Sequence, residues 1–378
     1  MTSGSGSGSA SGSGSASGSG SASGAGSASG ARVLSGRGLA AEIRGGTAAA
    51  VAELAAARRP PRVTVVTATD DEATAWYVRS IVTAAGKAGI GCEVEDLGAG
   101  ASAAAIEAQL SALSGDPTVD GIILQTPLPG GVRLAGLAGV IDPAKDVDGA
   151  NPVSLGRLMT GLPAFAPATA SAVLALLDHY EVPLDGRHAV VVGRSAVVGK
   201  PVAHLLLDRN ATVTICHSRT RDLAVITRQA EVLVVATGRA GLIGASHVAP
   251  GATVIDVGTN ATADGGLVGD VDAGVAEVAG ALSPVPGGVG PVTTALLLRH
   301  VTDAAARRIA GLRLRVAGLA SPAIVTICPV YANLFPLGAT WHRRSHGSQA
   351  RRARPGSQRC KPVAVTTATS LHRCGLAW

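Results

Sequence analysis

Short apolar runs rich in β-branched residues alternate along the chain with longer amphipathic stretches. The run at 62–67 (RVTVVT) lies between Pro-Pro and Asp-Asp and is typical of a buried strand. Further runs of this kind occur at 90–97, 119–125, 188–193, 211–216, 231–236 and 252–257. Helical patterns precede or separate several of them, at 39–57, 72–88, 167–179 and 200–208. Strands that alternate with helices predict an α/β fold with parallel sheets and right-handed crossovers.

The predicted strands form two series, one before and one after about residue 148. Two series of this kind predict two α/β domains with a cleft between them, which is where ligands usually bind. The apolar content fits such sheets, because 47% of the residues are hydrophobic but only 2% are aromatic. The core must therefore consist of Ala, Val, Leu and Ile, as in buried parallel strands.

Both ends of the chain differ from the rest. Residues 1–30 are almost entirely Ser, Gly and Ala and predict a flexible, disordered head. After Asp303 there is no acidic residue but twelve basic ones, which leaves 20 basic against 26 acidic residues in 1–303, a net charge of −6. The formal charge of +6 thus comes from the tail. We expect a basic, disordered tail at 309–378 and no specific nucleic-acid partner.

Cysteine spacing and hydropathy bear on the compartment. The five cysteines show no C-x-x-C spacing, so we expect neither a disulfide framework nor a metal site. The first residues lack the apolar core of a secretory signal. The uncharged stretch Val316–Trp341 is long enough to span a bilayer, but Pro322, Pro329 and Pro336 argue against a membrane helix. A cytoplasmic location is the expectation.

The clearest local chemistry is a strand–glycine turn–helix unit at 188–201 (HAVVVGRSAVVGKP). The turn Gly193-Arg194-Ser195 and the helix that starts near Gly199 could hold a phosphate with backbone N–H groups. The spacing departs from G-x-G-x-x-G because Ser195 replaces the second glycine. An ordinary βα turn without a ligand is the alternative.

The next strand end indicates which dinucleotide is bound. NAD enzymes usually place an acidic residue there, whereas this chain has His217-Ser218-Arg219. A hydroxyl and two basic groups, with Arg194 nearby, suit the 2′-phosphate of NADP. A solvated loop that binds no ligand is the alternative, because it often has the same composition. The later strand ends, 236–238 and 256–260 with Thr259, are where the dinucleotide should cross the sheet.

Four blocks together carry a resemblance to a known family. They are 120–129 (DGIILQTPLP), 145–149 (KDVDG), 193–201 (GRSAVVGKP) and 284–291 (PVPGGVGP). In order and spacing they resemble the bifunctional methylenetetrahydrofolate dehydrogenase/cyclohydrolases, from about residue 32 to 303. The resemblance implies an enzyme of one-carbon metabolism and purine biosynthesis, with tetrahydrofolate derivatives and NADP as ligands and commonly a homodimer.

The resemblance also implies the domain limits. A tetrahydrofolate-binding catalytic domain would occupy 31–149 and be completed by a helix at 291–308. A Rossmann-like NADP domain would occupy 150–290, with the cleft between the two. By the same resemblance Tyr77, Gln125 and Asp148 are the catalytic residues, with Tyr77 stacking on the substrate and Asp148 anchoring the pterin ring.

The remaining site residues follow from the same blocks. Pro286, Gly287 and Gly288 would let the backbone approach substrate and cofactor closely. Cofactor contacts are expected from five positions: Gly193, Arg194, Ser195, Ser218 and Thr259. As isolated residues, Asp148 could be a capping or salt-bridging carboxylate, Tyr77 a packing aromatic, and the glycines an ordinary turn.

One family feature is missing. The family's cyclohydrolase motif is Tyr-x-x-x-Lys, but the fourth residue after Tyr77 is Ile81. Lys87 is about 80° off the face of Tyr77 on a helix and Arg79 is nearly opposite, so neither is a good substitute. We therefore predict NADP-dependent oxidation of methylenetetrahydrofolate with weak or lost cyclohydrolase activity. The alternatives are a fully bifunctional enzyme, or a non-catalytic paralogue that binds NADP or folate.

Overall fold

The computed structural model describes the backbone of residues 30–57, 59–262 and 265–316, with side chains as far as residue 310. These residues belong to the first of two units of the chain, Met1–Ser321; the second is Pro322–Trp378. The predicted head, almost all of the predicted tail and the apolar stretch Val316–Trp341 lie outside the described residues apart from a few at their edges.

The first sheet has three parallel strands in the order β3-β2-β4, with β2 at Arg62–Thr67, β3 at Gly91–Asp96 and β4 at Gly121–Leu124. The Val and Thr side chains of β2 are buried because helices cover this parallel sheet. Its helices are α2 (Glu72–Ala88), α3 (Ala103–Gly115) and α4 (Leu134–Ala138), and α5 (Pro152–Met159) follows in the chain.

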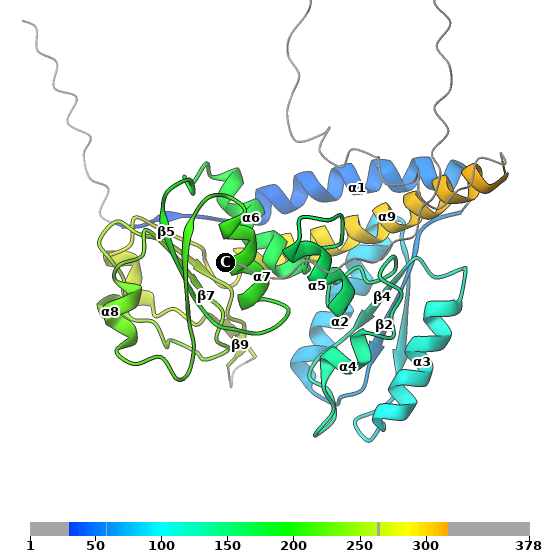
Figure 1. The fold of residues 1–378 in the computed structure, drawn as a ribbon, viewed down its shortest axis with the longest axis horizontal. Helices are drawn as coiled ribbons and strands as arrows, with labels where there is room; N and C mark the ends of the chain where they lie inside the picture. Colours follow the sequence, from blue (N-terminus) through cyan, green and yellow to red (C-terminus); the bar gives the residue numbers. More distant parts are fainter. Residues whose placement is uncertain (1–29, 58, 263–264, 317–378) are drawn as a thin grey trace, which may run out of the picture. The chain divides into compact units, whose positions relative to one another are not determined.

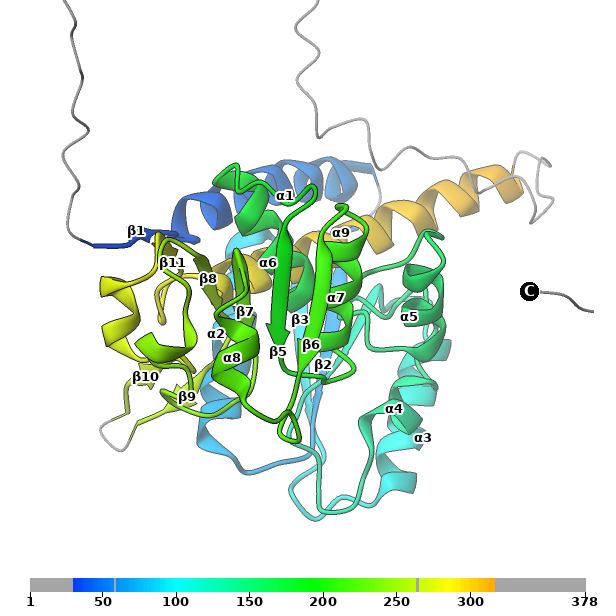
Figure 2. The same ribbon diagram turned by 60° about the vertical axis from the view of Figure 1, so that its left-hand side comes forward.

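The second sheet has six parallel strands in the order β1-β11-β8-β7-β5-β6 (Figure 2). The strands are β1 (Arg32–Val33), β5 (His188–Val192), β6 (Thr212–Cys216), β7 (Val232–Val235), β8 (Thr253–Asp256) and β11 (Ala281–Leu282). The helices of this part are α6 (Ala168–His179), α7 (Gly199–Leu207) and α8 (Leu223–Thr227), with 3-10 turns at Ala245–His247 and Ala273–Glu277. A two-stranded hairpin joins β9 (Asn260–Ala261) and β10 (Leu267–Val268). The α/β prediction is confirmed.

Two helices far apart in sequence lie side by side (Figure 1). They are α1 (Arg37–Ala57) and α9 (Val289–Val316), and α9 also packs against α6 and β4. The helix expected at 291–308 is therefore longer, and residues 309–316, which the sequence assigned to a disordered tail, are helical. Residues 32–33 likewise pair with the six-stranded sheet, although the sequence placed them in the first domain.

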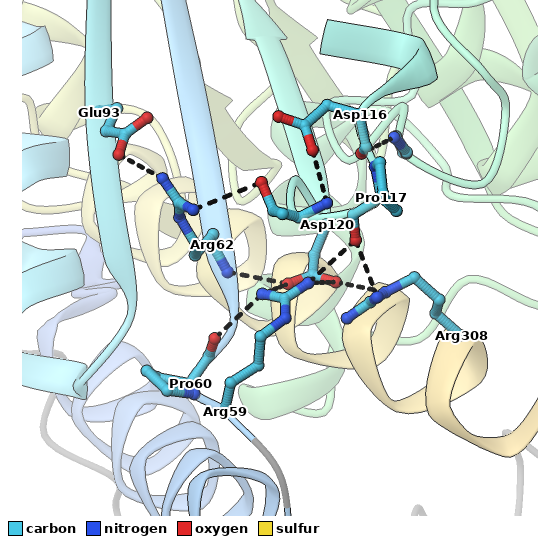
Figure 3. A network of polar contacts seen from close by, with 10 residues as sticks. Arg59, Pro60, Arg62, Glu93, Asp116, Pro117, Asp120 and Arg308 are labelled. Atoms are coloured by element: carbon cyan, nitrogen blue, oxygen red, sulfur yellow. Dashed lines mark hydrogen bonds and ion pairs between the residues drawn. The ribbon is translucent and has the colours of Figure 1, made fainter. Parts of the chain in front are cut away.

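A buried carboxylate fixes the start of β4 (Figure 3). Asp120 accepts hydrogen bonds from the backbone N–H of Arg62 at 2.9 Å and from Arg59 Nη1 at 3.1 Å. Its other oxygen accepts from Arg308 Nε at 2.8 Å, on α9. Asp120 begins one of the four sequence blocks, and its contacts give it a structural role: it ties β4 to β2 and α9.

Candidate active site

A cleft of about 1090 Å³ lies among loops from both sheets. Its lining includes the start of α2, the end of β4, the loop after β8 and the start of α9. Of the predicted site residues, Tyr77, Gln125 and Thr259 line it directly. Val198, Gly290 and Thr293 lie on its walls, so the nucleotide turn and the start of α9 both adjoin the same space.

Tyr77 reaches the cleft because α2 begins at a fixed point. Asp71 caps the helix, accepting from the backbone N–H of Thr74 at 2.8 Å and from its hydroxyl at 2.7 Å. Burial, and then the nearby charge of Asp148, raise the pKa of Tyr77 to about 12, while Thr294 lowers it by a hydrogen bond. Tyr77 is therefore a neutral phenol, able to pack a ring and donate one hydrogen bond.

The two aspartates of the KDVDG block have different roles. Asp146 is buried and accepts from the backbone N–H groups of Ala150 at 3.0 Å and Asn151 at 2.9 Å, which holds the loop together. Asp148 is half-buried, and no hydrogen bond or ion pair to it occurs among the described residues. Burial, and then the charge of Asp146, raise the pKa of Asp148 to about 7. Asp148 is thus the carboxylate that remains for a ligand.

Two side chains hold this loop from outside. The ammonium group of Lys145 donates to the carbonyl oxygens of Ser114 at 2.7 Å and Asp116 at 2.6 Å, at the end of α3. His300 of α9 is buried, and its Nδ1 lies 2.8 Å from the carbonyl oxygen of Val147. Burial lowers the pKa of His300 to about 4, so the ring is neutral and Nδ1 donates. No sequence pattern pointed to His300, which is the single histidine of α9.

Gln125 follows β4 and extends its pairing. Its backbone N–H donates to the carbonyl oxygen of Val66 at 2.9 Å, and its side chain is half-buried at the cleft. The peptide bond between Thr126 and Pro127 is cis. Tyr77 and Gln125 are therefore brought to one cleft, as predicted, from α2 and from the end of β4.

Ile81 is completely buried in the core with Val63, Val65 and Val78. An apolar side chain thus takes the position where the family motif has its lysine. The two cations weighed as substitutes are both exposed on α2. Lys87 does not line the cleft, but Arg79 does, which differs from the expectation that it points away.

The glycines before α9 are required by close backbone contacts. A Cβ atom on Gly288 would lie 2.6 Å from the carbonyl oxygen of Pro284, and Gly287 has a φ of 111°. The backbone N–H of Gly36 donates to the carbonyl oxygen of Gly287 at 2.9 Å. Gly287 and Gly288 are buried, while Pro286, which follows a cis peptide bond, is exposed.

The nucleotide turn is tightly packed. A Cβ atom on Gly193, whose φ is 139°, would lie 2.3 Å from the carbonyl oxygen of Ala236, and one on Gly199 would lie 2.2 Å from that of Gly193. Ser195 Oγ accepts from the backbone N–H groups of Val198 at 3.1 Å and Gly199 at 3.3 Å. Ser195 therefore satisfies the start of α7 and keeps its own hydroxyl hydrogen for a ligand.

Arg194 follows β5 and Arg219 follows β6, so these two basic side chains lie at the ends of adjacent strands. β5 and β6 pair in parallel, and the backbone N–H of Gly193 donates to the carbonyl oxygen of Cys216 at 2.9 Å. Arg194, Ser218 and Arg219 are exposed there, and no carboxylate occurs at 217–220. Two guanidinium groups and a hydroxyl without an acidic residue fit a phosphate better than a ribose hydroxyl.

Sequence reasoning missed a buried pair of aspartates, Asp256 and Asp270, next to the loop that carries Thr259. Asp270 accepts from the backbone N–H of Thr237 at 2.6 Å and from Asn260 Nδ2 at 2.9 Å, joining the loops after β7 and β8. Asp256 accepts from the backbone N–H of Asp270 at 3.0 Å, and burial raises its pKa to about 6. The neighbouring glycines are the one trace of this pair in the sequence. Gly269 has to be a glycine because a Cβ atom there would lie 1.8 Å from Asp256 Oδ2.

Comparison with known proteins decides the family. Residues 34–148 match the catalytic domain of tetrahydrofolate dehydrogenase/cyclohydrolase, and residues 167–309 match its NAD(P)-binding domain. The chain belongs to this family. It is 61% identical over 275 residues to Bifunctional protein FolD 1 of Saccharopolyspora erythraea, an alignment that covers 72% of this chain and 94% of that one. It is 62% identical to the Rhodococcus jostii protein of the same name, over 74% of this chain and 95% of that one.

Solved structures agree. The bifunctional FolD enzyme of Campylobacter jejuni matches with a TM-score of 0.70 and 37% identity, over 73% of this chain and 99% of that one. The Trypanosoma brucei FolD, described in complex with NADP and an inhibitor, has a TM-score of 0.70 and 35% identity, over 74% and 99%. The predicted family, enzyme class and NADP-type cofactor are thus confirmed. Within the described part of the chain, every helix is too short or too polar to cross a bilayer.

Proposed function

We propose that this chain oxidises 5,10-methylenetetrahydrofolate to the 5,10-methenyl form with NADP, and that its cyclohydrolase activity is weak or lost. The observation that carries the proposal is the pairing of an uncommitted carboxylate, Asp148, with the neutral phenol of Tyr77 beside the cleft. The intact blocks at 145–149 and 284–291 argue against a non-catalytic paralogue.

Binding comes from Asp148, which has no hydrogen bond or ion pair among the described residues, and from Tyr77, whose hydroxyl accepts from Thr294 and keeps its own hydrogen. The carboxylate of Asp148 can accept two N–H hydrogen bonds from the pterin ring, which fixes the ring in its plane. The ring of Tyr77 then packs against the flat substrate, and its hydroxyl remains a donor. The buried glycines at 287–288 allow the backbone to approach the ligands.

The hydride step makes few demands on side chains. NADP, when bound, supplies the acceptor for the hydride. The substrate's own nitrogens stabilise the cation that develops at the methylene carbon. The chain therefore has to hold two ligands in register, which Asp148, Tyr77 and the loops tied by Asp270 can do.

The hydrolytic step makes a different demand. Water adds to the methenyl carbon, one proton leaves the water, and one must reach a ring nitrogen so that the carbon–nitrogen bond can break. Tyr77 and Gln125 are poor acids and bases at neutral pH, and Ile81 can neither donate nor accept. Asp148, whose pKa is raised to about 7, is in this proposal engaged by the pterin ring, so the step lacks the lysine that the family motif supplies. Arg79, at the margin of the cleft, favours one alternative, in which its charge keeps the enzyme bifunctional.

NADP is the proposed preference over NAD, because Arg194, Ser218 and Arg219 stand where an NAD enzyme usually has an acidic residue. Thr259, which lines the cleft, is the proposed contact toward the nicotinamide end. A cytoplasmic homodimer completes the proposal, and the dimer rests on the family resemblance alone. The proposed domain limits stay at 31–149 and 150–290, except that residues 32–33 belong with the six-stranded sheet and the completing helix extends to Val316. Sedimentation analysis of the purified protein tests the dimer.

The experiment follows both steps separately. Purified protein is given methylenetetrahydrofolate and NADP, and formation of NADPH is recorded. Methenyltetrahydrofolate is then added directly, and its decay is compared with the decay in buffer. We expect NADPH formation and a decay close to the buffer rate. Absence of NADPH formation contradicts the dehydrogenase, and decay well above the buffer rate contradicts the loss of the cyclohydrolase.

A further inference from the structure

A cavity of about 530 Å³, separate from the cleft, adjoins the loop that leads into the KDVDG block. It lies among the loop at 142–145, α5, the segment 163–165 and the part of α9 at 304–308. None of the described residues lines both this cavity and the cleft, and none of the residues assigned above to substrate or cofactor lines it. Its volume lies within the range of about 300–1,000 Å³ that is usual for small-molecule sites.

The lining of the cavity is basic, although residues 1–303 carry a net charge of −6. Its charged members are two carboxylates, Asp120 and Asp142, and four cations, Lys145, Arg157, Arg307 and Arg308. Asp120 is paired with Arg308, as Figure 3 shows. Three cations and one carboxylate remain, so the lining keeps an excess of positive charge.

Three polar side chains of the lining lack a hydrogen-bond partner in the described structure. Arg157 is exposed near the end of α5, and no ion pair or side-chain hydrogen bond to it occurs among the described residues. The guanidinium carbon of Arg307 lies 4.5 Å from the centre of the Phe165 ring, a contact that leaves the N–H groups at its edge for an acceptor. Ser154 is 1% exposed, and its Oγ has no hydrogen-bond partner among the described residues. Buried polar groups normally have a partner, and a ligand in the cavity would supply one.

We propose that this cavity binds a phosphate monoester of a small molecule. Such an ester carries a charge of about −1.5 to −2 near pH 7, which complements the excess of cations in the lining. Guanidinium groups donate two parallel hydrogen bonds to phosphate oxygens. The apolar part of the ester would contact Pro143, Pro163 and Phe165, which also line the cavity.

One path from the cavity to the active site runs through two rings. Phe165, which lines the cavity, packs against His300 with their ring centres 5.0 Å apart. His300 in turn lies 2.8 Å from the carbonyl oxygen of Val147, the residue before Asp148. A ligand that fixes Phe165 should therefore also steady the backbone that carries Asp148.

A second path runs through the loop itself. Lys145 lines the cavity and lies three residues before Asp148 in the chain. Burial raises the pKa of Asp146 and Ser154 lowers it, so Ser154 lies close to the same loop. An anion that joins α5 to α9 across the cavity should hold this loop in place and lower the KM for methylenetetrahydrofolate. This coupling rests on the function proposed above, whereas binding of the anion does not.

The binding experiment is a calorimetric titration with phenyl phosphate. NADP is present at saturation, so that the nucleotide turn is occupied and does not take up the probe. We expect wild type to bind, and the Arg157→Gln, Arg307→Gln double variant to bind about 2- to 25-fold more weakly, because exposed ion pairs are modest. Lysine at both positions keeps the charge and should lose less. The Arg133→Gln, Arg228→Gln double variant removes two exposed cations at the ends of α4 and α8, outside the cavity, and should bind like wild type.

The outcomes of the titration decide the site. No binding to wild type overturns it, and equal affinity in the two glutamine double variants places the anion elsewhere and overturns it too. Inorganic phosphate that binds as tightly as phenyl phosphate overturns the monoester, because the apolar wall then contributes nothing. Binding should also weaken as salt is added.

The coupling is tested by the KM for methylenetetrahydrofolate with and without phenyl phosphate, at saturating NADP. We expect the KM to fall about five-fold, at the lower end of usual coupling between sites, in wild type and not in the Arg157→Gln, Arg307→Gln variant. An unchanged or raised KM while the probe binds overturns the link to the Asp148 loop. Failure to oxidise methylenetetrahydrofolate at all contradicts the proposed function instead, and the titration still decides whether the site exists.

Discussion

His300 of α9 donates a hydrogen bond of 2.8 Å to the carbonyl oxygen of Val147, the residue before Asp148. The bond joins residues 153 positions apart in the chain and is buried. It fixes the backbone from which the Asp148 carboxylate projects. Burial lowers the pKa of His300 to about 4, so the ring is neutral near pH 7 and donates through Nδ1.

The first prediction concerns this bond. His300→Ala leaves the carbonyl of Val147 without a donor and should cost about 1–3 kcal/mol of stability. It should also raise the KM for methylenetetrahydrofolate, since Asp148 is less well placed, with little change in the KM for NADP. His300→Asn can place an amide N–H near the position of Nδ1 and should recover most of both losses. Urea denaturation and steady-state kinetics on the same preparations measure the two effects.

An unchanged substrate KM in a folded His300→Ala variant would mean that the loop holds its position without α9. The matched Asn variant separates this outcome from general damage to the core. Loss of stability without a change in KM would assign His300 a purely structural role.

The second prediction concerns the pH profile. The pKa of Asp148 is raised to about 7, whereas an ordinary aspartate titrates near 3.8. Binding of the pterin N–H groups needs the carboxylate, so kcat/KM should be full above about pH 7 and fall about ten-fold per unit below it. Asp148→Asn should lower kcat/KM and remove this limb, because nothing remains to titrate there.

The profile is measured with kcat/KM for methylenetetrahydrofolate, which reports the free enzyme. A wild-type profile that is flat down to about pH 5 would show that Asp148 is not the anchoring group, or that the free enzyme solvates it. A limb that survives in Asp148→Asn would assign the titration to another residue, with Asp256 the first to be tested because its pKa is raised to about 6.

The strands and helices around this site could largely be predicted, because their signals are local. β2 is bounded by Pro61 and by Asp70, and α2 ends at Gly89, whose φ of 77° provides the left-handed cap. β1 and β11 could not be predicted, because each has two residues and is defined only by the strand beside it. A pairing of this length leaves no periodic pattern in sequence.

The residues that support the site were harder to predict than those that line it. Gln125 and Asp148 belong to contiguous blocks of sequence and Tyr77 to a short motif. His300 and Asp270 instead act on loops that are distant or separated by a turn. Their roles depend on tertiary hydrogen bonds, which single-residue patterns do not encode. The exposure of Arg79 to the cleft was missed for a related reason: a long side chain can reach around a helix.

The third prediction concerns the cofactor. Arg194→Gln should lower kcat/KM for NADP by about 10- to 100-fold, since a charge-assisted phosphate contact contributes about 1.5–3 kcal/mol. The value for NAD should change much less, because NAD lacks the 2′-phosphate. Ser218→Asp introduces an acidic group just after β6, where NAD enzymes usually have one. It should move the ratio of kcat/KM for NADP and NAD further toward NAD. Arg228→Gln, at the end of α8, serves as the matched control for loss of one exposed cation.

The measurement is the ratio of kcat/KM for the two dinucleotides in each variant. A wild-type ratio at or below one would contradict the charge argument at once. Equal losses for NADP and NAD in Arg194→Gln would mean that the guanidinium contacts a part that both cofactors share, such as the pyrophosphate.

The last prediction concerns Ile81. Its side chain is completely buried beside Val63 and Val78, so Ile81→Lys places an amine at the edge of the core and should lower stability by a few kcal/mol. Partial burial lowers the pKa of a lysine, which suits it to proton transfer near neutral pH. The side chain can extend toward the cleft along Tyr77, one turn away. Ile81→Met is the matched control, because it has a similar length and no amine.

We expect Ile81→Lys to accelerate the decay of added methenyltetrahydrofolate at least ten-fold over the Met variant, since a positioned proton-transfer group contributes about 10²–10⁴-fold. Hydride transfer should stay within a few-fold in both variants, because that step moves no proton. If wild type already hydrolyses the methenyl compound far above the buffer rate, the enzyme has kept its second activity. Arg79→Gln then tests whether the cation at the cleft margin supplies it, and a decay unchanged by that variant would exclude this arginine as well.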